Sequence, residues 1–198
     1  MIAPFGLWRL LRESKGAATV EFALISPVMV LVLMGLFDMG YTLYAGVMLQ
    51  GALQEAARNS TVEGASEALG TIDDAVEKQV HRVVPNADLD FTRKSYSNFS
   101  DVGLAEDYTD TNGNGACDAG EPYEDANGNG SWDQDRGSNG LGGARDAVLY
   151  TVTMTYRRPF PMASLIGLPE NVTNEATTVL RNQPYDLQKS VAKLGNCA

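Results

Sequence analysis

Residues 17–37 read AATVEFALISPVMVLVLMGLF, and this stretch decides how the chain is organised. No charged residue occurs from Phe22 to Phe37, and Glu21 is the only charge in the whole stretch. About 20 apolar residues in a helix are enough to cross the hydrocarbon core of a bilayer. The stretch therefore predicts a membrane-spanning helix.

The charges on either side of this helix give it a direction. Arg9, Arg12 and Lys15 precede it, and the acidic domain follows it. Basic residues beside a span tend to stay on the cytoplasmic side, so we expect a single pass with the N-terminus inside. An ordinary secretion signal has a shorter apolar run that ends at a small-residue cleavage site. Tyr44-Ala45-Gly46 matches such a site poorly, and the secretion-signal interpretation is disfavoured.

Glu21 is unusual, because a carboxylate within a membrane segment costs on the order of a few kcal/mol and usually has a function. It is the fifth residue of an apolar segment that begins at Ala17, directly after a basic leader ending in Gly16. This order resembles a type IV prepilin processing site. Residues 20–24, VEFAL, together with Pro27, resemble the TadE-type pseudopilins and their TadG-type relatives of the tight-adherence (Tad) pilus.

The resemblance implies cleavage between Gly16 and Ala17 by a prepilin peptidase, with residues 1–16 as the leader that is removed. Glu21 would then offset the new amino terminus of a neighbouring pilin or pseudopilin subunit as their N-terminal helices bundle. The implied location is the bacterial cytoplasmic membrane, with the C-terminal domain outside. TadG-like relatives share the helix without necessarily losing the leader. An uncleaved anchor with Glu21 at the membrane interface therefore stays open.

Beyond the membrane, residues 61–198 predict a small exposed domain, which gives the chain an α+β fold. Apolar residues spaced by three and four over 69–83 are typical of an amphipathic helix, and alternating segments indicate strands. We expect the membrane helix to continue to residue 60 as a stalk and to pack on a small antiparallel sheet, since so few strands need a helix for stability. The strands are expected at 88–93, 147–157 and 176–181, and the apolar strip of the stalk at Leu43, Val47, Ala52 and Ala56.

Residues 158–171 contain three prolines and a glycine and predict an irregular connection between strands. We expect its apolar side chains to fill the core, and an exposed contact patch is the alternative. These side chains are Phe160, Met162, Leu165, Ile166 and Leu168.

The net charge of −10 arises in one window. Residues 101–135 hold ten Asp and Glu residues and no Lys or Arg, and elsewhere acids and bases balance. Nucleic acid is therefore an unsuitable partner, because phosphate contacts need clustered Lys and Arg. A concentrated acidic window indicates either a solvated segment or a cation site.

The window contains a calcium-type loop at residues 110–121, DTNGNGACDAGE. Oxygen-bearing side chains occupy positions 1, 3, 5, 9 and 12, and Gly115 stands at position 6, where an EF-hand loop turns sharply. Calcium prefers six to eight hard oxygen ligands, which alternate residues on a tight loop can supply. The predicted ligands are Asp110, Asn112, Asn114, Ala116 through its main-chain carbonyl, Asp118 and Glu121.

A second copy follows at 125–136, DANGNGSWDQDR, with Arg136 in place of the position-12 Glu. Asp135 or Glu124 are the substitutes that the sequence suggests. Only residues 122–124 separate the loops, which leaves no room for EF-hand helices, so the pair resembles the helix-less calcium loops of extracellular repeat modules. We expect Ca²⁺ as the cofactor, and a metal-free Asn-Gly turn region is the alternative. The predicted ligands of this copy are Asp125, Asn127, Asn129, Ser131 and Asp133.

Two further features complete the sequence-based picture. Cys117 and Cys197 are the only cysteines, and in an exported domain they form either a disulfide or two free thiols. His81 is the only histidine and has no second residue that would complete a zinc site, and no nucleophile or nucleotide motif occurs. We therefore expect no enzymatic activity.

These features favour a minor pilin or pseudopilin-like subunit for assembly of a Tad-type pilus or secretion machine, with tandem calcium loops at 110–136. The alternative is an uncleaved, single-pass, calcium-binding or adhesive envelope protein that never enters a filament. Cleavage after Gly16 separates the two.

Overall fold

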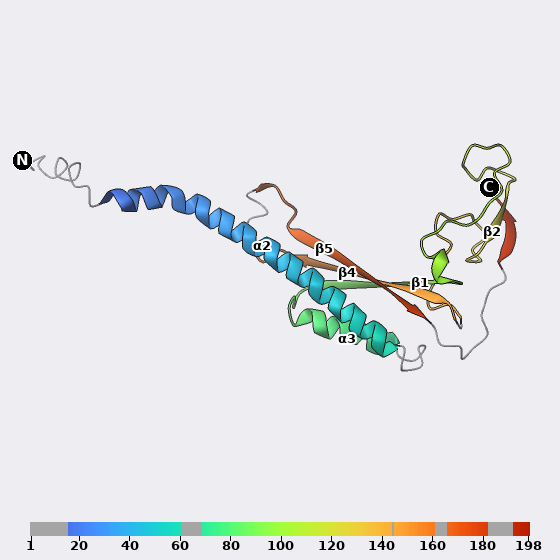
Figure 1. The fold of residues 1–198 in the computed structure, drawn as a ribbon, viewed down its shortest axis with the longest axis horizontal. Helices are drawn as coiled ribbons and strands as arrows, with labels where there is room; N and C mark the ends of the chain where they lie inside the picture. Colours follow the sequence, from blue (N-terminus) through green and yellow to red (C-terminus); the bar gives the residue numbers. More distant parts are fainter. Residues whose placement is uncertain (1–15, 61–68, 144, 161–165, 182–191) are drawn as a thin grey trace, which may run out of the picture. The chain divides into compact units, whose positions relative to one another are not determined.

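The computed structural model describes residues 16–60, 69–143, 145–160, 166–181 and 192–198 (Figure 1). All of the predicted leader except Gly16 therefore lies outside the described residues. The chain divides into two compact units. One comprises Met1–Leu43 and Arg158–Glu170, and the other comprises Tyr44–Arg157 and Asn171–Ala198.

Helix α2 runs over 44 residues from Ala17 to Ser60, so its first residue is the one expected after leader cleavage. Pro27 lies inside this helix and has no N–H to donate to the carbonyl of Ala23, one turn earlier. The hydroxyl of Ser26 donates to that same carbonyl at 3.4 Å. The sequence thus supplies a local partner where the proline removes one, which helps an apolar helix to remain continuous.

The first part of α2 is long and apolar enough to cross a membrane, and none of its most apolar window is buried. The core helix of a soluble protein would instead bury such a face. Val20, Leu24 and Phe37 are each at least 60% exposed, as expected for side chains that face lipid. The α+β prediction with a long N-terminal apolar helix is confirmed.

The second unit contains a four-stranded antiparallel sheet in the order β3-β1-β4-β5 (Figure 1). The predicted strands are present, and two of them are longer than expected. Strand β3 was not predicted. The strands are β1 (Asp88–Tyr96), β3 (Ser138–Asn139), β4 (Ala147–Arg157) and β5 (Asn171–Arg181).

The core of this unit is formed by the stalk of α2, by helix α3 and by alternate residues of β4. Val148, Tyr150, Val152, Met154 and Tyr156 are buried, as period-two alternation requires. Helix α3 (Leu69–His81) contributes a buried stripe. On the α2 stalk, the buried residues are Ala45, Leu49, Ala52, Leu53 and Ala56.

The predicted strip on the stalk was therefore half wrong. Ala52 and Ala56 are buried, but Leu43 and Val47 are 60% and 70% exposed. The buried residues follow spacings of three and four from Ala45, whereas Leu43 and Val47 lie on another side of the helix.

Helix α3 is held to the sheet by one acidic residue as well as by apolar contacts. Asp73 accepts hydrogen bonds from the hydroxyl of Tyr150 and from the guanidinium of Arg93. The guanidinium also lies 4.4 Å from the centroid of the Tyr150 ring. This cluster joins α3, β1 and β4 in one network.

A second, two-stranded sheet pairs β2 (Pro122–Asp125) with β6 (Lys193–Asn196). A 3-10 turn, η2 (Phe99–Asp101), ends at the first residue of the acidic window. Strand β2 lies between the two predicted calcium loops, so β6 brings the C-terminal end of the chain against them.

The expectation that residues 158–171 fill the core is wrong for the described residues. Ile166 and Leu168 are 57% and 45% exposed, and Phe160 is half-buried. Met162 and Leu165 lie outside the described residues.

Candidate functional site

The first loop is organised around the carboxylate of Asp110, at position 1. Its oxygens accept the backbone N–H groups of Gly113 at 2.5 Å, Asn114 at 3.2 Å and Gly115 at 2.8 Å. Gly115 has φ +78°, a left-handed conformation that favours glycine, and this explains why glycine stands at position 6.

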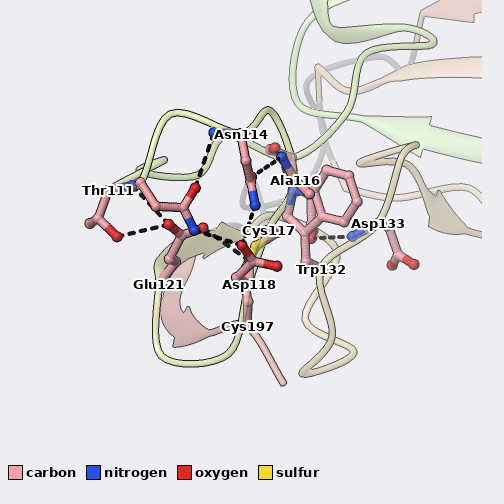
Figure 2. Close-up of a disulfide and its surroundings, with 11 residues drawn as sticks. Thr111, Asn114, Ala116, Cys117, Asp118, Glu121, Trp132, Asp133 and Cys197 are labelled. Atoms are coloured by element: carbon pink, nitrogen blue, oxygen red, sulfur yellow. Dashed lines mark hydrogen bonds between the residues drawn. A yellow bond between two sulfur atoms is a disulfide. The ribbon is translucent and has the colours of Figure 1, made fainter.

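The asparagines at positions 3 and 5 both bond the acid at position 9, and Figure 2 shows Asn114 pointing toward Asp118. The side-chain amides of Asn112 and Asn114 donate to Asp118 Oδ2 at 2.7 and 2.5 Å. Their Oδ1 atoms accept the N–H groups of Asn114 and Ala116. An oxygen that accepts one N–H keeps a second lone pair, so these oxygens retain capacity for a cation.

Glu121, at position 12, closes the loop. Oε1 accepts the N–H and the hydroxyl of Thr111, both at 2.8 Å, and Oε2 accepts the N–H of Asp118 at 3.0 Å (Figure 2). Glu121 is only 4% exposed. Glu121 therefore connects Thr111, the residue after position 1, with Asp118, the residue at position 9.

Hydrogen bonding favours the ionised form of two acids of this loop, Asp110 and Glu121. The N–H of Gly115, followed by that of Gly113, lowers the pKa of Asp110. The N–H of Asp118 and the two donors of Thr111 lower the pKa of Glu121. Both shifts favour the carboxylate, which is the form that binds a hard cation.

The second loop repeats this arrangement residue by residue. Asp125 accepts the N–H groups of Gly128 at 2.7 Å, of Asn129 at 3.1 Å and of Gly130 at 3.0 Å. The amides of Asn127 and Asn129 donate to Asp133 Oδ2 at 2.8 and 2.5 Å. Oδ1 of each asparagine accepts an N–H two residues on, that of Ser131 in the case of Asn129. The sequence repeat is thus a repeat in three dimensions.

Glu106 takes the place in the second loop that Glu121 holds in the first. Its Oε1 accepts the N–H of Ala126 at 2.8 Å, and its Oε2 accepts that of Asp133 at 3.1 Å. These donors are again the residue after position 1 and the residue at position 9. Glu106 is 1% exposed. Glu106, which precedes both loops in the sequence, therefore supplies the carboxylate that the second copy lacks at its position 12.

Backbone pairing brings Glu106 to this position. The segment around it runs antiparallel to β2, with Thr109 N–H donating to Pro122 O at 2.9 Å and Glu124 N–H donating to Asp107 O at 2.8 Å. Glu106 also bonds Asp133 through the main chain at 3.0 Å. Sequence spacing within the loop could not identify Glu106, because it lies 19 positions before the loop begins at Asp125. The missing position-12 acid was the only signal that one had to come from elsewhere.

The substitutes suggested by the sequence do not take this place. Asp135 accepts Lys94 Nζ at 2.5 Å and the hydroxyl of Tyr96 at 2.9 Å, so its carboxylate is used at the sheet. Arg136 pairs with Asp107 at 2.8 Å. Glu124 donates its main-chain N–H to Asp107 O, and its charge acts on Arg136. It is therefore Glu106, and not Asp135 or Glu124, that makes in the second loop the bonds that Glu121 makes in the first.

A disulfide joins Cys117, in the first loop, to Cys197, next to β6 (Figure 2). Their Cα atoms are 5.7 Å apart, within the usual range for such a bond. Main-chain bonds flank it, from Gly120 N–H to Cys197 O at 2.9 Å and from Cys197 N–H to Glu121 O at 2.8 Å. The C-terminal end of the chain is thereby fixed to the first loop.

The oxygen atoms of both loops suit a hard cation, although they do not all come from acidic side chains. Within the residues that the structure describes, no group of three or more Asp, Glu, His or Cys side chains converges as a metal cluster. Loops of this type also use amide and main-chain oxygens, which are present at positions 3, 5 and 7 of each copy. The fit to calcium therefore lies in the alternation of oxygen types around each loop.

The predicted processing residues lie together at the start of α2. Gly16 precedes the helix, Ala17 begins it, and Glu21 is exposed one turn later. Residues 16–58 match the family model described as TadE-like protein. This segment is similar to the TadE-like family. The TadE-like segment contains all three processing residues and ends near the end of α2, so both acidic loops lie outside it.

No curated protein and no solved structure matches the chain.

Proposed function

We propose that the chain is a minor pilin or pseudopilin-like subunit for assembly of a Tad-type pilus or secretion machine. The observation that supports this proposal most is the TadE-like match over residues 16–58, on a helix whose apolar part is exposed along its length. An exposed apolar helix needs lipid or other helices around it. Subunits of this chain and related pilins would supply those helices.

Glu21 is the residue that we assign to subunit pairing. Its carboxylate is exposed on an apolar helix, where an opposite charge would remove most of the desolvation cost. Cleavage after Gly16 by a prepilin peptidase would create such a charge at the amino group of Ala17. The carboxylate of one subunit and the amine of the next would then pair within the bundle.

The exposed domain would be stabilised by two calcium ions. Asp110, Asp118 and Glu121 would hold the first, and Asp125, Asp133 and Glu106 the second, each with the amide and main-chain oxygens of its loop. The match between Glu121 and Glu106 supports two complete sites better than one complete and one defective site. Calcium loops of this kind brace a structure and do not act as sensors that expose a groove.

The cysteines support the proposed side of the membrane. The Cys117–Cys197 disulfide needs an oxidising compartment, and the bacterial cytoplasm keeps thiols reduced. Together with the basic residues before α2, this supports an N-terminus inside and an exposed domain outside the cytoplasmic membrane.

The pilus role is tested by exchanging Glu21 for Gln in the source bacterium and counting surface pili. Membrane insertion should persist, because the helix becomes more apolar, while pilus number should fall. Glu55→Gln is the matched control, since Glu55 is exposed on the same helix but outside its apolar part. Normal piliation in the Glu21→Gln strain would instead favour the uncleaved, calcium-binding or adhesive anchor.

A further inference from the structure

The start of the connection between β4 and β5 contacts α2 at the end of its apolar part. The ring of Phe160 stacks on the ring of Phe37 with centroids 6.2 Å apart. The guanidinium of Arg158 pairs with Asp38, the first charged residue after the apolar run. Both contacts fall within one compact unit of the chain.

These contacts place the connection at a defined level of the helix. Residues 17–37 span about 31 Å at 1.5 Å per residue, close to the roughly 30 Å of a bilayer hydrocarbon core. Phe37 therefore lies at the outer edge of the hydrocarbon, and Asp38 lies at the interface. Phe160, stacked on Phe37, is at the same depth.

The connection is built as an apolar segment with charges at its base. No charged residue occurs between Arg158 and Glu170. Arg158 links the two ends of the connection by hydrogen bonds. Its main-chain N–H donates to Glu170 O at 2.9 Å, and its side-chain Nε donates to Pro169 O at 3.0 Å. Ile166 and Leu168 remain 57% and 45% exposed, and water would be an unfavourable surrounding for them.

We infer that this connection is a second membrane contact, which inserts Phe160, Ile166 and Leu168 into the lipid interface beside α2. The inference rests on the proposed membrane anchoring of the helix. Lipid is the occupant that the geometry favours, because Phe160 stacks on Phe37 at the outer end of the apolar helix, and Ile166 and Leu168 are exposed in the same compact unit. The Asp38–Arg158 pair neutralises the two charges that lie nearest the hydrocarbon. The exposed domain would thus be tethered to the bilayer at two points.

The test places single added tryptophans in the full-length protein, reconstituted in phosphatidylcholine vesicles whose acyl chains carry bromine. Bromine quenches tryptophan only on near contact, and subtracting the wild-type signal isolates each added residue. Ile166→Trp should lose most of its added fluorescence, as should Val28→Trp within the helix. Phe99→Trp is the matched control, because Phe99 is 72% exposed on η2 and should remain unquenched.

The outcomes separate this inference from the membrane anchoring itself. Quenching of Val28→Trp without quenching of Ile166→Trp overturns the second contact and leaves the anchor intact. Failure to quench Val28→Trp overturns the anchoring and the inference with it. Equal quenching of Ile166→Trp and Phe99→Trp would also contradict the inference, because it would report unspecific exposure to lipid.

Discussion

Replacing Glu106 with Gln should abolish one of the two proposed calcium sites and leave the other. The carboxylate accepts three backbone N–H bonds, from Ala126 at 2.8 Å, Asn127 at 3.4 Å and Asp133 at 3.1 Å. Gln keeps one acceptor oxygen but presents an NH₂ group where a second acceptor is needed. A hydrogen bond to a charged group contributes about 1.5–3 kcal/mol, so we expect a loss of that size even without calcium.

Calcium adds a second, separable effect. Extracellular loops of this type bind with dissociation constants of roughly 10⁻⁴–10⁻³ M. At a calcium concentration about ten times that constant, each site stabilises the folded domain by about 1.4 kcal/mol. The wild type should gain about 2.8 kcal/mol from two independent sites, and the Glu106→Gln variant about 1.4 kcal/mol.

The assay is calorimetric titration of the detergent-solubilised protein, with denaturant unfolding in calcium and in chelator. Glu121→Gln should leave one site in the same way, since Glu121 makes the equivalent bonds in the first loop. Glu124→Gln is the matched control and should leave both sites. A Glu106→Gln variant that still binds two ions, or a Glu124→Gln variant that loses one, would refute the assignment.

Three other outcomes are expected. Leu53→Ala should destabilise the exposed domain by about 2–5 kcal/mol in denaturant unfolding, because Leu53 is fully buried, whereas Val47→Ala at an exposed position should change little. Burial, reinforced by a hydrogen bond to a carboxylate, raises the pKa of Tyr96 to about 12 from 10.0. The stability that the protonated Tyr96 contributes below pH 10 should therefore be lost as the pH rises toward 12. A Tyr96→Phe variant that loses stability as steeply as the wild type over this pH range would contradict the prediction. Replacing both Cys117 and Cys197 with Ser should lower stability by roughly 2–5 kcal/mol, and unchanged unfolding in reducing and oxidising buffer would argue against the bond.

Periodicity in the sequence predicted the helices and strands whose apolar residues recur at a regular spacing. The apolar run of α2, the amphipathic stripe of α3 and the alternation in β4 all appear as expected. The stalk was only half predicted, because Leu43 and Val47 are as apolar as the buried residues, and which side faces the sheet is a tertiary property. The two-stranded sheet of β2 and β6 was missed, since each strand is four residues long and has no alternation of its own.

The candidate site shows the same limit. Motif spacing located both loops, because their ligands are contiguous in sequence and the backbone alone brings them together. Glu106 was missed because antiparallel pairing with β2, and not loop spacing, carries it to the second loop. The apolar residues at 158–170 were expected in the core since the sequence does not show what surrounds them. The contacts of Phe160 with Phe37 and of Arg158 with Asp38 relate the described part of this connection to the apolar end of α2.

The central claim, that this is a pilin-like subunit released from a leader, is tested most directly by the intact mass of the protein extracted from its own bacterial membrane. The account predicts a chain that begins at Ala17, the first residue of α2, and a Gly16→Val variant that keeps its leader. A wild-type mass that includes residues 1–16 would contradict it and would leave the chain as an uncleaved membrane anchor.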